Sequence, residues 1–305
     1  MNRINIGNGK INASEISLGC MRISKLSVNE ASILINTALE EGIDFFDHAD
    51  IYGGGRSEEV FADAVNMNPS VREKLIIQTK CGIGQGYFDF SKEHILNSVE
   101  GSLKRLKTDY VDALLLHRPD TLMEPEEVAE AFDILNSSGK VRYFGVSNQN
   151  PMQIELLNKY LNQKIIINQL QLSITNTGML DSGINVNMKI DSSIDRDGSI
   201  LEYCRLKDIT IQAWSPFQYG FFEGVFLDND KFPELNRKIN EVAEAKGVTN
   251  TAIAIAWILR HPAKIQPIAG TTSSKRLKDI CMASTIELTR QEWYEIYRAA
   301  GNKLP

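Results

Sequence analysis

The sequence predicts a (β/α)8 barrel, the TIM-barrel fold, on the basis of three observations. Strand-like and helix-like segments alternate along the 305 residues, which is typical of α/β proteins with a parallel sheet. Eight strand-like segments are present, and most are apolar throughout, as expected of parallel strands buried on both faces. No linker or change in composition divides residues 1–305, so we expect one domain.

The predicted strands are preceded by a predicted hairpin. The strands cover residues 15–20, 42–49, 74–80, 110–117, 142–147, 165–173, 209–215 and 264–270. Before them, residues 4–13 place Gly7-Asn8-Gly9 between two strand-like segments, which indicates a β-hairpin. We expect this hairpin to plug the bottom of the barrel.

Start and stop signals predict helices between the strands. Ser27 and Glu30 form a capping box that opens a helix ending at Gly42. Further helices are predicted to open at Ser57, Ser91, Pro125 and Pro151. Two extra helices are expected, one over residues 249–259 and one opened by a second capping box, Thr289 with Glu292.

Two segments do not fit the repeat. Residues 174–199 are polar and rich in Gly, Ser, Asn and Asp, and are expected to form a long loop without regular structure. Residues 216–232 carry Phe217, Tyr219, Phe221, Phe222 and Phe226. Because both segments follow strands, we expect both to lie over the C-terminal rim of the barrel. The aromatic residues suggest an apolar mouth, although burial in the core explains some of them equally well.

Composition argues against several classes of partner. The formal net charge of −6 leaves no basic surplus to neutralise nucleic-acid phosphates or an anionic membrane. The first residues lack the apolar core of a signal peptide, and no stretch reaches the roughly 18 apolar residues needed to span a bilayer. The four cysteines are scattered without a C-x-x-C pair, which favours free thiols in a cytoplasmic protein.

Asp47, Tyr52, Lys80 and His117 carry the strongest chemical signal. Three of them close predicted strands, and Tyr52 follows one by five residues. In a barrel, the C-terminal ends of the strands share one rim, where catalytic groups gather. Tyr52 is then a proton donor whose pKa a nearby Lys80 would lower, Asp47 would hold the lysine, and His117 would donate a hydrogen bond to a carbonyl oxygen.

Each of these residues also has an ordinary structural interpretation. Alone, Asp47 reads as a capping residue, Tyr52 as a packing residue before Gly53-Gly54-Gly55, Lys80 as a solvent-reaching lysine and His117 as a core histidine. Their joint occurrence at successive strand ends makes coincidence the weaker explanation.

Three competing motifs are weaker. Gly82-Ile-Gly84-Gln-Gly86 lacks the third glycine of a dinucleotide-binding fingerprint, since Tyr87 stands at that offset. Gly7 to Lys10 has the wrong spacing for a phosphate-binding loop. His48 could suggest a metal site beside Asp47 and His117, but the chain has four histidines and no His-x-His pair, so packing is the better interpretation.

These residues resemble the aldo-keto reductase family. Asp47 to Gly53, Thr79-Lys80 and Leu116-His117 match the family's catalytic pattern in order and spacing, in a form similar to that of a bacterial branch. The resemblance covers nearly the whole chain. It implies a barrel enzyme that reduces a small-molecule carbonyl substrate by hydride transfer, with Tyr52 as the acid.

The resemblance also implies an NADP(H) site. Its residues would be Met21, Ser147, Asn148, Gln169, Trp214, Ser215, Pro216, Phe217, Gly270, Thr271, Thr272 and Arg276. Ser147, Asn148 and Gln169 would bind the nicotinamide carboxamide, and Trp214 would stack on the ring. Arg276, near a predicted helix start, would bind the 2′-phosphate, although Gly270 stands where many members carry a lysine.

Two other functions stay open at this level. A cofactor-binding redox sensor with little turnover would keep the same residues, and a metal-dependent barrel hydrolase would need a bound metal. The substrate would be selected by residues 82–90, 174–199, 216–232 and the C-terminal tail. The sequence sets neither its identity nor the oligomeric state.

Overall fold

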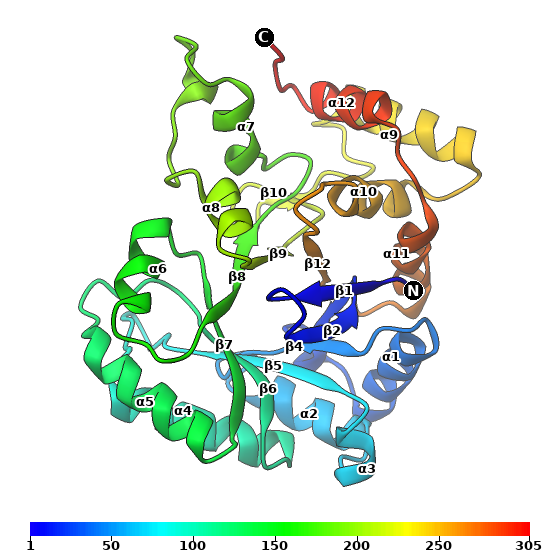
Figure 1. The fold of residues 1–305 in the computed structure, drawn as a ribbon. Coiled ribbons are helices and arrows are strands. Elements are labelled where there is room, and N and C mark those ends of the chain that lie inside the picture. Colours follow the sequence, from blue (N-terminus) through cyan, green and yellow to red (C-terminus); the bar gives the residue numbers. More distant parts are fainter.

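The computed structural model describes residues 1–305 and confirms the closed barrel (Figure 1). Eight parallel strands pair in the order β12-β3-β4-β5-β6-β7-β8-β9. They are β3 (Ser17–Gly19), β4 (Phe45–Asp47), β5 (Ile76–Cys81), β6 (Val111–Leu116), β7 (Val141–Ser147), β8 (Ile165–Gln171), β9 (Thr210–Trp214) and β12 (Gln266–Ala269). Each lies within or overlaps one predicted strand.

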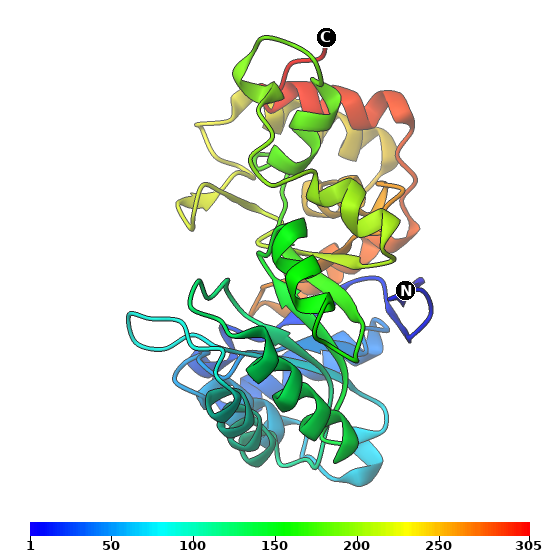
Figure 2. The same ribbon diagram turned by 60° about the vertical axis from the view of Figure 1, so that its left-hand side comes forward.

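Helices surround the barrel, and Figure 2 shows them from a second side. They are α1 (Val28–Glu40), α2 (Arg56–Ala64), α3 (Pro69–Arg72), α4 (Lys92–Leu106), α5 (Pro125–Ser137), α6 (Pro151–Asn158), α7 (Gly178–Ile184), α8 (Ile200–Leu206), α9 (Pro233–Lys246), α10 (Asn250–Leu259), α11 (Ser274–Cys281) and α12 (Arg290–Ala299). Short 3-10 turns cover Ile23–Lys25, Asp191–Ser193 and Met282–Thr285. A core of 65 buried hydrophobic residues joins strands to helices. No helix is both long and apolar enough to cross a membrane.

The predicted helix starts are confirmed except one. Ser27 and Thr289 form both predicted capping boxes, and Ser91 accepts a hydrogen bond from His94 N. Ser57, predicted to open α2, lies inside its first turn. The chain enters that helix through Gly55 at φ +92°, and the Ser57 hydroxyl donates instead to the Met21 carbonyl at 3.3 Å.

The N-terminal hairpin closes the bottom of the barrel, as expected. Strands β1 (Arg3–Ile6) and β2 (Ile11–Ser14) pair antiparallel, and their apolar side chains pack against residues inside the barrel such as Phe45 and Ile166. The turn requires glycine at position 7, which has φ +59° and where a Cβ would lie 2.6 Å from Cβ of Ile166. Gly7 N donates to Thr210 Oγ1 at 3.0 Å, which anchors the turn to β9.

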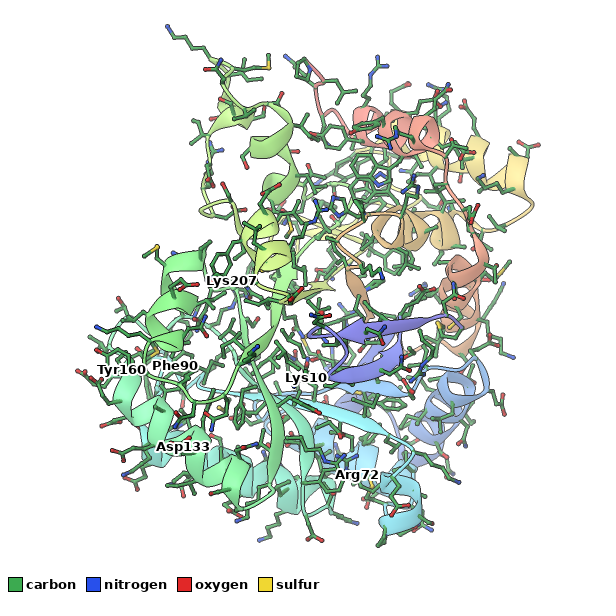
Figure 3. All side chains as sticks on the ribbon, in the orientation of Figure 1. Lys10, Arg72, Phe90, Asp133, Tyr160 and Lys207 are labelled. Carbon is green, nitrogen blue, oxygen red and sulfur yellow. The ribbon has the colours of Figure 1, made fainter.

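A buried ion pair stabilises the same end of the barrel. Figure 3 shows the side chains that fill the molecule and labels Arg72 near the start of β5. Arg72 Nη2 lies 2.7 Å from Asp112 Oδ2, and both side chains are buried. Its guanidinium also donates to the carbonyls of Leu75 and Tyr110, so both terminal nitrogens have partners.

The two inserted segments contain more structure than predicted. Residues 174–199 were expected to form an irregular loop over the rim, but they contain α7 and the turn at Asp191–Ser193. Tyr297 OH donates to Asp181 Oδ1 at 2.7 Å, so α7 packs against α12. Residues 216–232 form the short antiparallel pair β10 (Gln218–Tyr219) and β11 (Gly224–Val225). Helices α8 and α9 had not been predicted, although Pro233-Glu234 is a recognisable helix start.

Candidate active site

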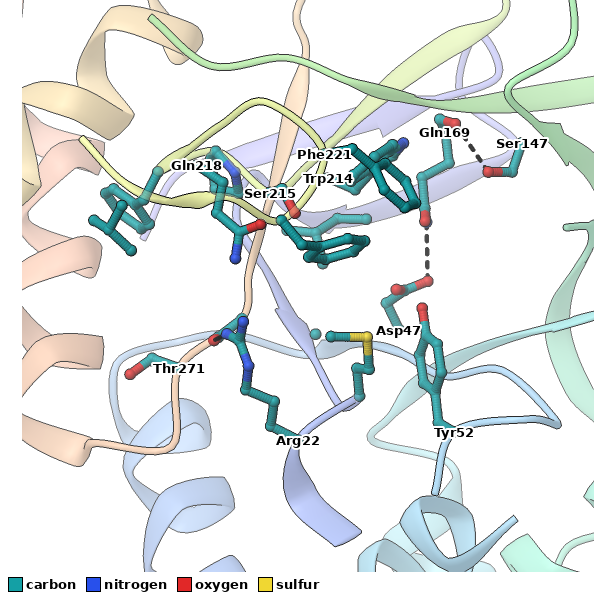
Figure 4. Close-up of a pocket in the computed structure, with 18 of the residues that line it drawn as sticks. Arg22, Asp47, Tyr52, Ser147, Gln169, Trp214, Ser215, Gln218, Phe221 and Thr271 are labelled. Carbon is teal, nitrogen blue, oxygen red and sulfur yellow. Dashed lines mark hydrogen bonds between the residues drawn. The ribbon is translucent and has the colours of Figure 1, made fainter. Parts of the chain in front are cut away.

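A pocket of about 790 Å³ opens at the C-terminal ends of the barrel strands (Figure 4). Its lining includes every predicted site residue except Lys80 and Thr272. Lys80 lies directly behind Asp47 and Tyr52, whereas Thr272 is exposed outside the lining. Residues 174–199 and the C-terminal tail, which were expected to select the substrate, contribute nothing to the lining.

Lys80 is the centre of a buried polar cluster. Its Nζ lies 2.8 Å from Asp47 Oδ1, 2.7 Å from the His48 carbonyl oxygen and 3.2 Å from Tyr52 OH. The Lys80 side chain has no exposed surface and Asp47 is buried. An ammonium so far from water is stable only because carboxylate, carbonyl and phenol oxygens surround it.

Strand register and a glycine-rich turn place these groups together. Asp47 pairs with Gln78 on β5, and Lys80 is two residues further along the same strand, so Gln78 and Lys80 both point into the barrel. Tyr52 follows β4 on a turn where Gly53, Gly54 and Gly55 all have positive φ. At Gly53 a Cβ would lie 2.5 Å from Cβ of Ser24, so glycine permits the close approach that fixes Tyr52.

The ionisation of the cluster differs in part from what the sequence predicts. Burial raises the pKa of Tyr52, and although Lys80 lowers it as expected, the net shift is upward. Lys80 therefore acts on the pKa of Tyr52 in the predicted direction, but desolvation of the phenolate is the larger effect in the protein alone. Burial lowers the pKa of Lys80, but Asp47 and Tyr52 outweigh it and the net pKa is raised. The lysine is an ammonium at neutral pH.

His117 faces Tyr52 as a neutral imidazole. The two ring centroids are 5.9 Å apart and the rings are nearly perpendicular, at 79°. Burial lowers the pKa of His117 well below its ordinary value, and Lys80 and Arg118 lower it further. A neutral imidazole keeps one N–H, which can donate a hydrogen bond without bringing a second cation into the site.

Neighbouring strands present amide and hydroxyl groups beside Asp47. Ser147 and Gln169 are register partners on β7 and β8, and Ser147 Oγ donates to the Gln169 carbonyl oxygen at 3.0 Å. Asn148 donates to Ser147 Oγ at 2.7 Å and accepts from Trp214 Nε1 at 3.1 Å. Gln169 Nε2 donates to Asp47 Oδ1 at 3.0 Å, a contact drawn in Figure 4. Gln169 Oε1 accepts no hydrogen bond from the protein, so it is free to accept one from a carboxamide.

The opposite end of the pocket is cationic. Arg276 lies in the first turn of α11, whose N-cap Ser273 accepts a hydrogen bond from Arg276 N. Arg22, not predicted from the sequence, lies beside Thr271 in Figure 4 and donates to the Gly270 carbonyl oxygen at 2.7 Å. A Cβ at Gly270 would be 3.6 Å from Arg22 Nη1, so Arg22 lies next to the position where many family members carry lysine. Neither Arg22 nor Arg276 has a carboxylate partner within 4.0 Å.

Arg118 is a second pocket residue that sequence reasoning missed. Its guanidinium lies 5.5 Å from the Trp214 ring centroid and 5.8 Å from that of Phe221, and it forms no ion pair. Phe222 stacks on Trp214 with centroids 5.9 Å apart. The position directly after His117 was the one available signal, because a residue just past a barrel strand faces the pocket.

His48 packs in the core, in line with its preferred interpretation. It is fully buried, and its ring lies 4.6 Å from that of Phe61 in an edge-on arrangement. Burial, with a smaller effect of Lys80, lowers the pKa of His48 to about 3, so the ring is neutral. No three His, Cys, Asp or Glu side chains gather in a way that could hold a metal ion.

Comparisons with known proteins agree with this geometry. A sequence model of the Aldo/keto reductase family matches residues 15–300. An uncharacterized oxidoreductase, YcsN of Bacillus subtilis, is 37% identical over 96% of both chains, and a 6-dehydroglucose reductase of Agrobacterium fabrum is 35% identical over 96% of both. The solved structure of the thermostable aldo-keto reductase Tm1743, a complex with the inhibitor epalrestat, matches with a TM-score of 0.80 and 26% identity, covering 98% of this chain and 100% of that one. This chain therefore belongs to the aldo-keto reductase family and is an oxidoreductase.

Proposed function

We propose that the protein is an NADPH-dependent reductase of aldehyde or ketone carbonyls and that Tyr52 is its general acid. The observation that supports this most is the buried contact of Tyr52 OH with Lys80 Nζ at 3.2 Å, with neutral His117 facing the same phenol. A phenol, an ammonium and an imidazole N–H meeting at one pocket wall suit an oxygen that becomes negative during reaction.

The residues present fit a nicotinamide cofactor. Such a cofactor, when bound, supplies a hydride to the carbonyl carbon. Ser147, Asn148 and Gln169 would hold its carboxamide, since the unpaired Gln169 Oε1 offers an acceptor and the Asn148 amide, hydrogen-bonded to Ser147 Oγ, lines the same pocket. Arg276 and Arg22 would hold its phosphates, because both cations lack a protein carboxylate. Two such cations favour NADP(H) over NAD(H).

Each catalytic residue then has one task. His117 donates its N–H to the carbonyl oxygen and so orients the substrate. Tyr52 transfers its proton to that oxygen, and Lys80 stabilises the phenolate that remains. Asp47 holds Lys80 charged and in place at 2.8 Å. The raised pKa of Tyr52 in the protein alone means that the phenol stays protonated, and therefore ready to donate, throughout the neutral range.

Replacing Tyr52→Phe tests the acid. The variant keeps the ring and removes only the proton, so we expect kcat to fall by about 100-fold or more while NADPH binding stays the same. Turnover is followed by NADPH absorbance with a panel of aldehydes, and binding by fluorescence titration. Unchanged kcat would refute the role of Tyr52. Tight NADPH binding by the wild type with no turnover on any carbonyl would favour the redox-sensor alternative.

We further propose that the substrate is a polar aldehyde, such as a sugar aldehyde. Two relatives, from Agrobacterium fabrum and Novosphingobium aromaticivorans, are 35% and 33% identical and are named 6-dehydroglucose reductases. The unpaired guanidinium of Arg118 in the pocket gives hydroxyl groups a donor. Arg118→Met should raise KM for 6-dehydroglucose about tenfold and leave KM for an aromatic aldehyde without hydroxyl groups unchanged. Equal effects on both aldehydes would contradict this substrate class.

A further inference from the structure

Four buried glutamines lie in the interior of the barrel, three of them beneath the pocket and the fourth, Gln169, at its wall. Gln78, Gln169, Gln212 and Gln266 lie on β5, β8, β9 and β12, and each is at most 3% exposed. Gln212 pairs in register with Gln169 on one side and with Gln266 on the other, and Gln78 pairs with Asp47. Strand register therefore brings these amides to one level of the barrel. We call these four residues the glutamine relay.

Hydrogen bonds are donated outward from Gln78 and Gln169, through Gln212 and Gln266 toward the hairpin and directly to Asp47. Gln266 Nε2 donates to the Ser14 carbonyl oxygen of the hairpin at 2.7 Å, and Gln212 Nε2 donates to Gln266 Oε1 at 2.8 Å. Gln212 Oε1 then accepts from both Gln78 Nε2, at 2.8 Å, and Gln169 Nε2, at 3.1 Å. The same two NH₂ groups donate to Asp47 Oδ1 at 2.6 and 3.0 Å.

The acceptor groups at the two ends of the relay determine how its amide groups are oriented. The Ser14 carbonyl and the Asp47 carboxylate, which pairs with Lys80, serve here as hydrogen-bond acceptors, so an NH₂ group must face each of them. Gln212 satisfies both ends at once. Its oxygen can accept from Gln78 and Gln169 only when its NH₂ group donates to Gln266. Reversing one amide would bring two oxygens or two NH₂ groups together in the dry interior, which is unfavourable.

The orientation of the Gln78 amide indicates that the hydrogen bonds of the relay hold Asp47. Its Oε1 is buried and has no hydrogen-bond partner. A buried amide oxygen without a partner destabilises the fold. The Gln78 NH₂ group nevertheless donates to Asp47 and Gln212 while the Gln78 amide oxygen has no partner. The contacts of the NH₂ group are therefore kept at the expense of the amide oxygen.

We propose that Gln212 is a positioning residue for the carbonyl reduction. It does not line the pocket. It holds the amides of Gln78 and Gln169 so that both donate to Asp47, and it thereby fixes the carboxylate that positions Lys80 against Tyr52. The hairpin contributes through Ser14 and Gln266, which hold Gln212 from below. This role rests on the proposed function, in which Asp47 and Lys80 support Tyr52.

The test combines Gln212→Met with Asp47→Asn in a double-mutant cycle. Methionine has a similar length and removes the amide, so we expect kcat to fall about tenfold. In the Asp47→Asn background, the same change should have little further effect on kcat, because its target carboxylate is already gone. Gln149→Met is the matched control, since Gln149 is buried and its side-chain oxygen forms no hydrogen bond, with the relay or any other residue.

The pH dependence of kcat distinguishes a positioning role of Gln212 from a general loss of stability. A less firmly held Asp47 supports the Lys80 ammonium less well, so the fall of kcat at high pH should begin at lower pH in Gln212→Met. If Gln212→Met does not fold, Gln266→Met is the second variant. It removes the anchor to Ser14 and the acceptor for Gln212 Nε2 but leaves Gln212 Oε1 on Gln78 and Gln169, so it should show a smaller shift in the same direction. An unshifted profile, or effects of Gln212→Met and Asp47→Asn that simply multiply, would overturn the proposal. Wild-type turnover and the Tyr52→Phe result are measured in the same assay, so failure of the proposed function is recognised separately.

Discussion

The charged side chains at the two ends of the pocket differ in burial and in ion pairing. At the catalytic end, Lys80 and Asp47 are buried and paired with each other. At the cationic end, Arg22 is half-buried, Arg276 is exposed, and neither has a carboxylate partner. A buried pair is fixed before any ligand arrives, whereas an unpaired surface cation gains most when an anionic ligand binds. On the proposed function, one end would therefore serve the reaction and the other the affinity for the cofactor.

Lys80→Met should have the largest effect, because it removes the centre of the catalytic cluster. We expect kcat to fall about 1000-fold with the cofactor dissociation constant unchanged. The loss of its ammonium also leaves Asp47 buried without a cation, so the melting temperature should drop. Steady-state kinetics, fluorescence titration and calorimetry measure the three quantities.

Lys92→Met is the matched control for that variant. Lys92 also forms an ion pair, at 2.7 Å with Glu130, but both side chains are largely exposed. Exposed ion pairs contribute little to stability because water screens them, so neither kcat nor the melting temperature should change noticeably. Similar losses in the two variants would contradict the view that burial makes the catalytic pair special.

Arg276→Met should have a smaller effect of a different kind. Losing one phosphate contact should raise the dissociation constant of NADPH about tenfold and leave that of NADH and the value of kcat unchanged. The measurement is fluorescence titration with both cofactors. A loss of kcat with unchanged affinity would break the distinction between the two ends.

Arg22 offers a rescue experiment at the same end. Arg22→Met should weaken NADPH binding severalfold, since its guanidinium lies beside Gly270. Adding Gly270→Lys to that variant restores a cation at the position where many family members carry lysine, and affinity should recover. If the double variant binds NADPH no better than Arg22→Met, Arg22 does not take the place of that lysine.

The sequence predicted the catalytic end better than the cationic end, for a physical reason. Asp47, Lys80 and His117 close apolar strands, and strand ends in a barrel meet at one rim, so their convergence follows from the strand pattern alone. Arg22 lies in a 3-10 turn region after β3, where no periodicity predicts the direction of a side chain. It was missed for that reason.

The effects of desolvation and of long-range contacts also could not be predicted from the sequence. The proximity of Lys80 to Tyr52 was predicted, but the net pKa of Tyr52 depends on how completely the phenol is buried, which requires the packed structure. Likewise the polar composition of residues 174–199 indicated a loop, whereas contacts such as Tyr297 with Asp181, 116 residues apart, support α7 there.

Lowering the pH should have the smallest effect, and it should change cofactor binding at the cationic end but not kcat. The pKa of His117 is held well below its ordinary value of about 6.5, so the imidazole stays neutral and kcat should remain flat from pH 8 to about 5. A phosphate monoester has a second pKa of about 6, so the 2′-phosphate of NADPH loses charge over the same range and its attraction to Arg276 weakens. KM for NADPH should therefore rise a fewfold while KM for NADH stays level. An inflection of kcat near pH 6.5 would show instead that His117 titrates normally, and that the catalytic end is less isolated from water than its burial indicates.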